Sequence, residues 1–117
     1  ADVIFPVAGG LGGATAQNAI ASKKSVVIWV DSDGVIAAPQ YKSVLLSSVL
    51  KGVGTSVTQV IRDTRSNKFN NTAYLGTLKN KGTGLAPFYD FDSKISQRTK
   101  DELKRLALAI ASGSLKI

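Results

Sequence analysis

The chain has 117 residues, 44% of them hydrophobic and 20% charged, which is ordinary usage for one small globular domain. Because it contains no cysteine and no histidine, thiol and imidazole nucleophiles, a histidine base and the common structural zinc sites are nearly excluded. The net charge is +7, but the basic residues are scattered among acidic ones and form no stripe with aromatic side chains, so we expect no nucleic-acid partner.

The first half of the chain alternates between predicted strands and a helix. Residues 3–6 are short, apolar and bounded by glycines, and they predict a buried strand. The alanine-rich segment 12–22 predicts a helix. Residues 25–30 form a continuous apolar run, which favours a strand covered on both faces, as in a parallel sheet. After a proline-containing loop at 37–41, residues 43–49 predict a third strand.

The second half contains two segments with helical spacing. Apolar residues recur every three or four positions in 53–66 and in 97–112, and each segment predicts an amphipathic helix. Between them, residues 72–78 predict a fourth strand, residues 80–84 a turn, and residues 85–92 an extended aromatic segment. The order predicts an α/β fold, Rossmann-like, with a mainly parallel sheet flanked by helices.

Ligands of such sheets collect at the carboxyl ends of the strands, and several polar or glycine-rich stretches lie there. The glycines at 9–13 lack the spacing of dinucleotide and phosphate-loop motifs. They leave two interpretations, a helix N-terminus open to a ligand and a tight turn. Phe5, just before Pro6, is either a core residue or a flat apolar face for a base or a sugar.

Asp31 and Asp33 follow the second strand in the sequence DSDGV. This pattern resembles the first motif of the haloacid dehalogenase phosphatases, which would make Asp31 the nucleophile, Asp33 the proton donor and Mg²⁺ the metal. That family also needs a lysine and a later acidic pair, for which 117 residues leave little room. The other interpretation is that Asp33 and Gly34 form a surface turn and only Asp31 is functional.

Lys51 ends another apolar strand and opens a predicted helix, where the helix dipole disfavours a cation. A nearby anion would offset this, and Asp31 lies at the end of a strand that could be a neighbour. Asp31 as acceptor and Lys51 as donor would form a pair suited to gripping neighbouring sugar hydroxyls.

Four blocks of the sequence resemble one family. ADVIFPVAGG, VDSD, VLLSSVLKGVG and GLAPFYDFDSKIS, followed by the closing SGSLKI, are similar to the C-terminal part of the basic membrane lipoproteins, purine-nucleoside-receptor-type substrate-binding proteins of ABC importers. The resemblance implies part of a type 1 periplasmic-binding-protein fold, in which two α/β lobes close on a ligand. It implies that residues 1–50 belong to one lobe, about 51–70 cross to the other, and the remainder forms the hinge and a closing helix.

The resemblance also implies a ligand site without catalysis, cofactor or metal. Phe5 would stack on the purine, while the backbone of Gly10 and the side chains of Asp31 and Lys51 would hold the ribose. The sequence departs from the family pattern at Leu11, where threonine is usual, and at Gly34, where glutamine is common.

The implied partners are a purine nucleoside, an ABC transporter permease and the N-terminal lobe, which this chain lacks. No stretch approaches the roughly 18 apolar residues of a membrane span, so the membrane contact would be a lipid anchor outside this chain. The implied location is the bacterial cell envelope, on the extracytoplasmic face of the plasma membrane. We therefore expect a fragment holding half of the cleft and an exposed apolar face. A sensor or regulator that uses the same pocket is the alternative within this fold.

Overall fold

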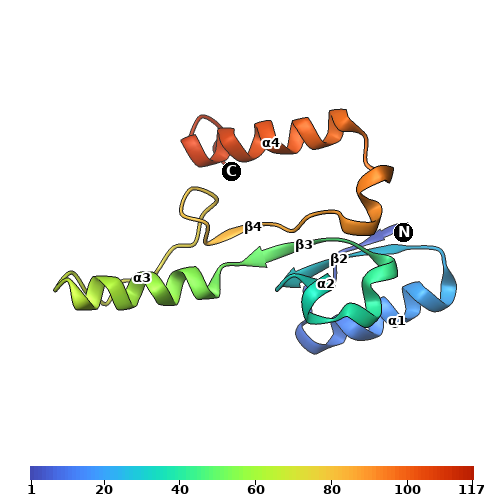
Figure 1. Ribbon diagram of the computed structural model, residues 1–117, viewed down its shortest axis with the longest axis horizontal. Coiled ribbons are helices and arrows are strands. Elements are labelled where there is room, and N and C mark those ends of the chain that lie inside the picture. The colour runs from blue at the N-terminus through green and yellow to red at the C-terminus, as the bar shows by residue number, and fades with distance from the viewer.

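The computed structural model describes residues 1–117 and combines four strands with four α-helices and three short 3-10 helices (Figure 1). The elements in chain order are β1 (Val3–Ile4), η1 (Gly9–Leu11), α1 (Gly12–Ser22), β2 (Val26–Asp31), α2 (Gly34–Ala37), η2 (Pro39–Val44), β3 (Leu45–Lys51), α3 (Val53–Arg65), β4 (Thr83–Leu85), η3 (Tyr89–Lys94) and α4 (Gln97–Ser112).

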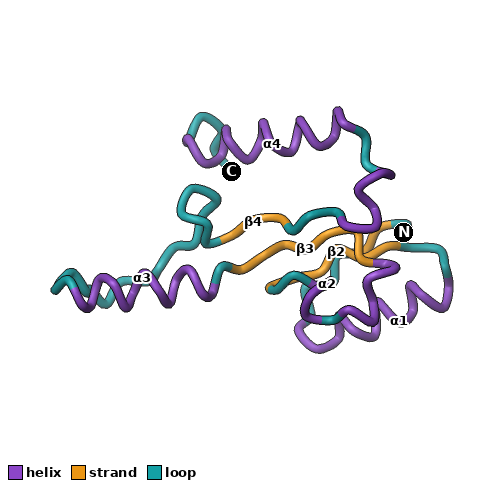
Figure 2. Tube along the Cα trace, in the orientation of Figure 1, coloured by secondary structure: helices purple, strands orange, loops and turns teal.

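The strands form one sheet in the order β1-β2-β3-β4 (Figure 2). β1 pairs with β2 and β2 with β3 in parallel, whereas β4 runs antiparallel to β3. The register of the central pair places Asp31 beside Leu50. Helices α1 and α2 lie on one side of the sheet in Figure 1, and α4 lies on the other. The prediction of an α/β fold with a mainly parallel sheet flanked by helices is confirmed.

Two of the predicted helices have the predicted bounds because their ends are determined locally. α1 ends at Lys23, which adopts the left-handed conformation with φ of 55°. α4 begins at Ser96, whose hydroxyl accepts a hydrogen bond from the Thr99 N–H, and ends at Gly113 with φ of 78°. A serine cap at the start and a left-handed glycine at the end are the usual signals of helix termini.

The core lies between α1 and the sheet and is small. Its five buried side chains are Ala16, Ala19, Val27, Val44 and Leu45. Trp29, Val35 and Tyr41 pack against this cluster and are partly buried. Since the two core residues of α1 are alanines, the helix can approach the strands closely.

The rest of the chain extends well beyond this core. Neither α3 nor α4 contains a buried residue, and α3 continues away from the end of β3 (Figure 1). The radius of gyration is 16.6 Å, above the roughly 13 Å of a compact domain of about 100 residues. The apolar side chains of Val53, Val57 and Ile61 are each more than half exposed. None of the helices combines the length and the apolarity that crossing a bilayer requires.

The predicted strand at 72–78 is wrong, and the predicted turn over 80–84 is confirmed only as far as residue 82. The fourth strand is instead Thr83–Leu85, which pairs with the edge of β3. The Asn80 side chain accepts hydrogen bonds from the Thr77 and Gly82 N–H groups and donates one to the Leu75 carbonyl. These local bonds close a loop over the segment that we expected to be extended, as Asn side chains commonly do.

Two further boundaries differ from the prediction. The third strand begins at Leu45 rather than residue 43, because the proline-led segment Pro39–Val44 forms a 3-10 helix. The aromatic segment predicted to be extended also turns into a 3-10 helix at Tyr89–Lys94.

The chain leaves the sheet at Gly52 and returns beside it at Gly82, so two backbone segments are in contact at this crossing. The Gly52 N–H donates to the Gly82 carbonyl at 2.9 Å. A Cβ atom on Gly52 would overlap the Lys81 carbonyl oxygen across the crossing, and one on Gly82 would overlap the Gly76 Cα within the returning segment. The close approach of these segments therefore requires residues without side chains.

We predict that Gly82→Ala destabilises the protein by about 1–3 kcal/mol, because the new methyl group must displace backbone atoms. The matched control is Gly54→Ala in α3, where an added Cβ meets nothing within 4 Å. This control should be neutral or stabilise by about 0.5–1 kcal/mol, since alanine is the better helix former. Urea unfolding of the two variants measures both effects, and equal stabilities would contradict the prediction.

Candidate functional site

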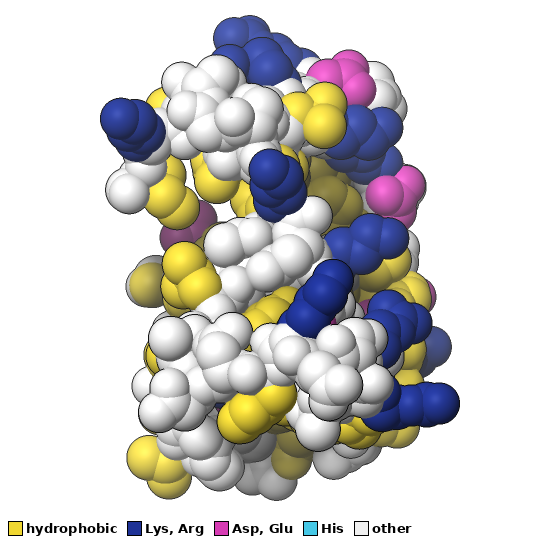
Figure 3. Space-filling model, turned by 90° about the vertical axis from the view of Figure 1, so that its left-hand side faces the viewer, with side chains coloured by type: hydrophobic (Ala, Val, Ile, Leu, Met, Phe, Trp, Pro, Cys, Tyr) yellow, Lys and Arg dark blue, Asp and Glu magenta, His cyan; other side chains and the backbone are white.

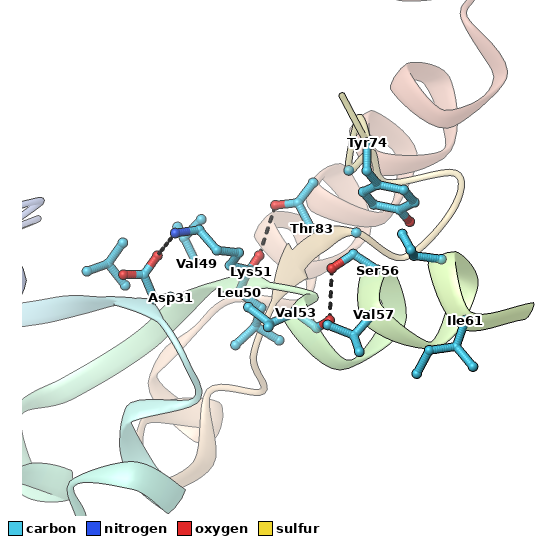
Figure 4. A pocket seen from close by; sticks show the side chains of 14 residues that line it. Asp31, Val49, Leu50, Lys51, Val53, Ser56, Val57, Ile61, Tyr74 and Thr83 are labelled. Atoms are coloured by element: carbon cyan, nitrogen blue, oxygen red, sulfur yellow. Dashed lines mark hydrogen bonds and ion pairs between the residues drawn. The ribbon is translucent and has the colours of Figure 1, made fainter. Parts of the chain in front are cut away.

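Asp31 and Lys51 are the last residues of the neighbouring parallel strands β2 and β3. Because parallel strands end at the same edge of a sheet, the two side chains meet there, and Lys51 Nζ lies 2.9 Å from Asp31 Oδ1 (Figure 4). Both side chains are more than half exposed, Lys51 at 66% and Asp31 at 57%. The structure thus brings together the acceptor and the donor that the sequence analysis paired.

An open groove of about 710 Å³ adjoins this pair. Asp31 and Lys51 lie at one end of it, and its floor is the exposed apolar face of α3 (Figure 4). Tyr74 lines the groove from the loop that follows α3. The groove therefore combines a large apolar surface with one charged pair, which is the usual composition of a small-molecule site.

Phe5 and Gly10 lie outside the residues that line this groove. Phe5 follows β1 and is 47% exposed. Gly10 belongs to the 3-10 helix η1 and is exposed, with nothing within 4 Å of the place of a Cβ. Both follow β1, which pairs with β2. Their assignment to the ligand site stays a prediction.

Asp33 has a structural function at the start of α2. Its Oδ1 accepts the Val35 N–H at 3.1 Å, and its Oδ2 accepts the hydroxyl of Tyr89 at 2.6 Å. A tyrosine phenol is protonated at neutral pH and can donate this bond, and the hydrogen bond to Asp33 raises the pKa of Tyr89 further. Both carboxylate oxygens of Asp33 therefore accept hydrogen bonds from within the chain.

Gly34 differs from the surface turn that we expected, because it is buried. Its N–H donates to the Ser48 hydroxyl at 3.0 Å. A Cβ on Gly34 would lie 2.6 Å from Trp29 Cγ and 2.9 Å from Leu45 Cδ1. The turn after β2 can thus pack against the core only because residue 34 is a glycine.

Sequence reasoning missed Tyr89 and Ser48, the two side chains that hold this turn. Tyr89 lies 56 residues from its partner Asp33, and Ser48 lies 14 residues from Gly34. No local pattern links residues so far apart. The sequence offers no signal for either residue, since Ser48 follows another serine and Tyr89 lies in a segment with two aspartates.

The arrangement gives little support to the phosphatase interpretation. The second aspartate of that motif would have to exchange a proton with a leaving group, whereas Asp33 already accepts two hydrogen bonds. The structure contains no group of three or more acidic side chains that could hold a metal ion.

The surface near the groove is basic and partly apolar. Figure 3 shows Lys and Arg side chains spread along one side of the face at the α3 end, with few acidic ones, and hydrophobic side chains exposed between them. The exposed apolar face that we expected is therefore present, and α3 contributes Val53, Val57, Val60 and Ile61 to it.

A mainly parallel sheet that presents an acceptor and a donor beside an open apolar groove is the arrangement in which α/β proteins commonly bind small ligands. The family model for Bmp, described as ABC transporter substrate-binding protein PnrA-like, matches residues 1–116. The chain belongs to this family, which confirms the resemblance drawn from the sequence. No curated protein matches the chain.

Three solved structures have a similar fold. A solute-binding protein of an ABC transporter system from Aeropyrum pernix K1 is 21% identical, with a TM-score of 0.74 over 97% of this chain and 39% of that one. Another from Conexibacter woesei DSM 14684 is 16% identical, with a TM-score of 0.66 over 100% of this chain and 37% of that one. A transcriptional activator of the comK gene from Bacillus halodurans is 14% identical, with a TM-score of 0.79 over 97% of this chain and 38% of that one. The chain thus spans less than two fifths of each, and the likeness supports the predicted binding-protein fold.

We predict that the Asp31–Lys51 pair contributes little to stability, because exposed ion pairs are worth about 0.2–1 kcal/mol. Asp31→Asn and Lys51→Gln should each change the free energy of unfolding by less than about 1 kcal/mol. Ser48→Ala should cost about 1–3 kcal/mol, since it leaves the Gly34 N–H buried without its partner. Urea unfolding of the three variants tests this order, and a larger loss in either charge variant than in Ser48→Ala would contradict it.

Proposed function

We propose that this chain forms part of the substrate-binding component of an ABC importer, which binds a purine nucleoside between two lobes and delivers it to a membrane permease. Membership of the Bmp family supports the role in transport. The single observation that carries the proposal is the exposed Asp31–Lys51 pair at the edge of the open groove. The action is binding and lobe closure, with no catalytic step.

The chemistry of the pair suits the sugar of a nucleoside. The Asp31 carboxylate accepts hydrogen bonds from two neighbouring hydroxyls, and the Lys51 ammonium donates to their oxygens. Since both groups are charged, these hydrogen bonds are stronger than those between neutral partners. Because Lys51 Nζ lies 2.9 Å from Asp31 Oδ1, one ligand with neighbouring hydroxyls can contact both groups at once.

We assign the base and the rest of the ribose to Phe5 and Gly10. The half-exposed ring of Phe5 offers a flat face on which a purine can stack. The backbone of Gly10 is open because no side chain covers it. Both residues follow the strand that pairs with β2, which is consistent with a shared sheet edge.

We further propose that residues 1–50 belong to one lobe, that about 51–70 cross to the other, and that the remainder forms the hinge and the closing helix. The contact between Gly52 and Gly82 marks where two segments cross. α3 has no buried residue and an exposed apolar face, which a second lobe would cover. The solved structures extend well beyond the 37–39% that this chain spans.

The proposal implies an extracytoplasmic location in the bacterial envelope. The partners would be the permease and the N-terminal lobe of the same protein, with a lipid anchor outside this chain. The exposed basic residues are compatible with a contact at an anionic membrane surface.

We predict that guanosine, adenosine or inosine raises the melting temperature of the protein expressed at its full natural length. Asp31→Ala and Lys51→Ala should abolish this shift, because each removes one half of the ribose-binding pair. Lys42→Ala is the matched control, since it removes an equally exposed lysine whose partner is Asp90 at 3.7 Å. No shift with any nucleoside would sink the proposal. Mg²⁺-dependent phosphate release from an aryl phosphate, lost in Asp31→Asn, would establish the phosphatase instead.

One observation favours a second role, as a sensor or regulator. The similar structure from Bacillus halodurans carries the description of a transcriptional activator. A regulator would bind the nucleoside through the same pair, so binding cannot separate the two roles. Uptake of labelled nucleoside by cells separates them, because only an importer loses uptake in the Asp31→Ala variant.

We predict that the 117 residues alone bind nucleosides weakly or not at all, because the groove is open and has one wall. The exposed α3 face should also drive self-association of the isolated chain. Calorimetric titration and analytical ultracentrifugation measure these properties. Micromolar affinity in the isolated chain would show that the pair needs no second lobe.

A further inference from the structure

We propose that Tyr89 is a positioning residue for Asp31, because its hydroxyl holds the turn that aims the Asp31 carboxylate at Lys51 and the groove. The role in ligand binding rests on the proposed function. The effect on the turn itself does not, because it follows from contacts within the chain.

The turn at Asp31 needs external support. Asp31 has φ of 71°, and the Ser32 N–H donates to the Val30 carbonyl at 2.9 Å. A hydrogen bond to the second residue back, across a residue with this φ, is a γ-turn of the rare and strained kind. Such conformations persist only where the surroundings hold them, and they are common at ligand sites.

Two side chains from other elements hold the segment that directly follows the γ-turn, at Asp33 and Gly34. Ser48 in β3 accepts the Gly34 N–H at 3.0 Å. Tyr89 donates to Asp33 Oδ2 at 2.6 Å, while Asp33 Oδ1 accepts the Val35 N–H. Ser48 is buried within the sheet, so it anchors the end of the turn that enters the core. Tyr89 is the support that comes from outside the β2–β3 unit.

Tyr89 can act as a support because its own segment is fastened to β3. The Ala86 N–H donates to the Ser48 carbonyl at 2.9 Å, and the Ser47 hydroxyl donates to the Ala86 carbonyl at 2.8 Å. Phe91, two residues beyond Tyr89, is buried. Tyr89 has φ of 45°, an uncommon value for a bulky residue. Its backbone is therefore held in a costly conformation that presents the hydroxyl to Asp33.

The same segment begins at the crossing that we assign to the hinge. The Thr83 hydroxyl donates to the Leu50 carbonyl at 3.0 Å, and β4 pairs with the end of β3 that carries Lys51. The segment from Thr83 to Tyr89 has only seven residues, and its backbone is hydrogen-bonded to β3 at Ala86. The hydroxyl of Tyr89 thus connects the hinge segment to Asp33, two residues beyond the residue proposed to bind the ligand.

The test is Tyr89→Phe in the protein expressed at its full natural length, a change that removes only the hydroxyl. We expect amide hydrogen exchange of Ser32 and Val35, followed by NMR, to accelerate several-fold. We expect the nucleoside Kd to rise about tenfold, as for loss of a hydrogen bond to a charged group. Asp90→Asn is the matched control, because it alters the neighbouring residue of η3 and breaks an exposed ion pair at 3.7 Å. It should leave exchange and Kd unchanged.

A second variant shows whether Tyr89 acts through Asp31. The background is Asp31→Asn, which keeps one acceptor oxygen and residual binding. In it, Tyr89→Phe should change Kd by less than about twofold, because the effects of mutations at coupled residues are not additive. An equal loss in both backgrounds would overturn the proposal. An unchanged rate of amide hydrogen exchange at Ser32 in Tyr89→Phe, with or without a ligand, would also overturn the proposal. If exchange accelerates but no nucleoside binds the unaltered protein, the proposed function fails while the positioning of the turn by Tyr89 is supported.

Discussion

The parallel pairing of β2 with β3 is the interaction on which the rest of the structure depends. Its two strands supply Val27 and Leu45, the largest apolar side chains of the fully buried core. An irregularity between Val27 and Ile28 shifts the register, so that Asp31 ends up beside Leu50 and one residue from Lys51. Because a slip of one residue would turn every side chain to the opposite face, the packing of the core also determines that the charged pair meets at the sheet edge.

At the ends of β2 and β3, some polar side chains stabilise the fold and others remain available to a ligand. Asp33, Ser47 and Ser48 form hydrogen bonds that hold the turn and the return segment, and no buried polar side-chain atom lacks a partner. Asp31 and Lys51 are exposed and bind only each other. Two aspartates one residue apart thus have different roles, because one is enclosed by donors and the other faces the groove.

The core of this chain is small because two of its helices lie outside it. α3 and α4 contribute no buried residue, and the two segments that lead to and from α3 touch at glycines. This contact keeps the return segment beside β3, where it pairs as β4 and then presents Tyr89. The apolar face of α3 stays exposed, with Val53, Val57 and Ile61 each more than half exposed.

The sequence by itself determined the elements whose signals are local, and it identified the pair at the sheet edge. Alanine content predicted α1, apolar spacing predicted α3 and α4, and apolar runs predicted β2 and β3, whose ends carry Asp31 and Lys51. Only the tertiary structure decided that Thr83–Leu85 rather than residues 72–78 forms the fourth strand, because the edge of β3 pairs with the former while the Asn80 side chain closes the preceding segment into a loop. The bond between Asp33 and Tyr89 likewise joins residues 56 positions apart, and such a contact exists only once the sheet has brought the two segments together.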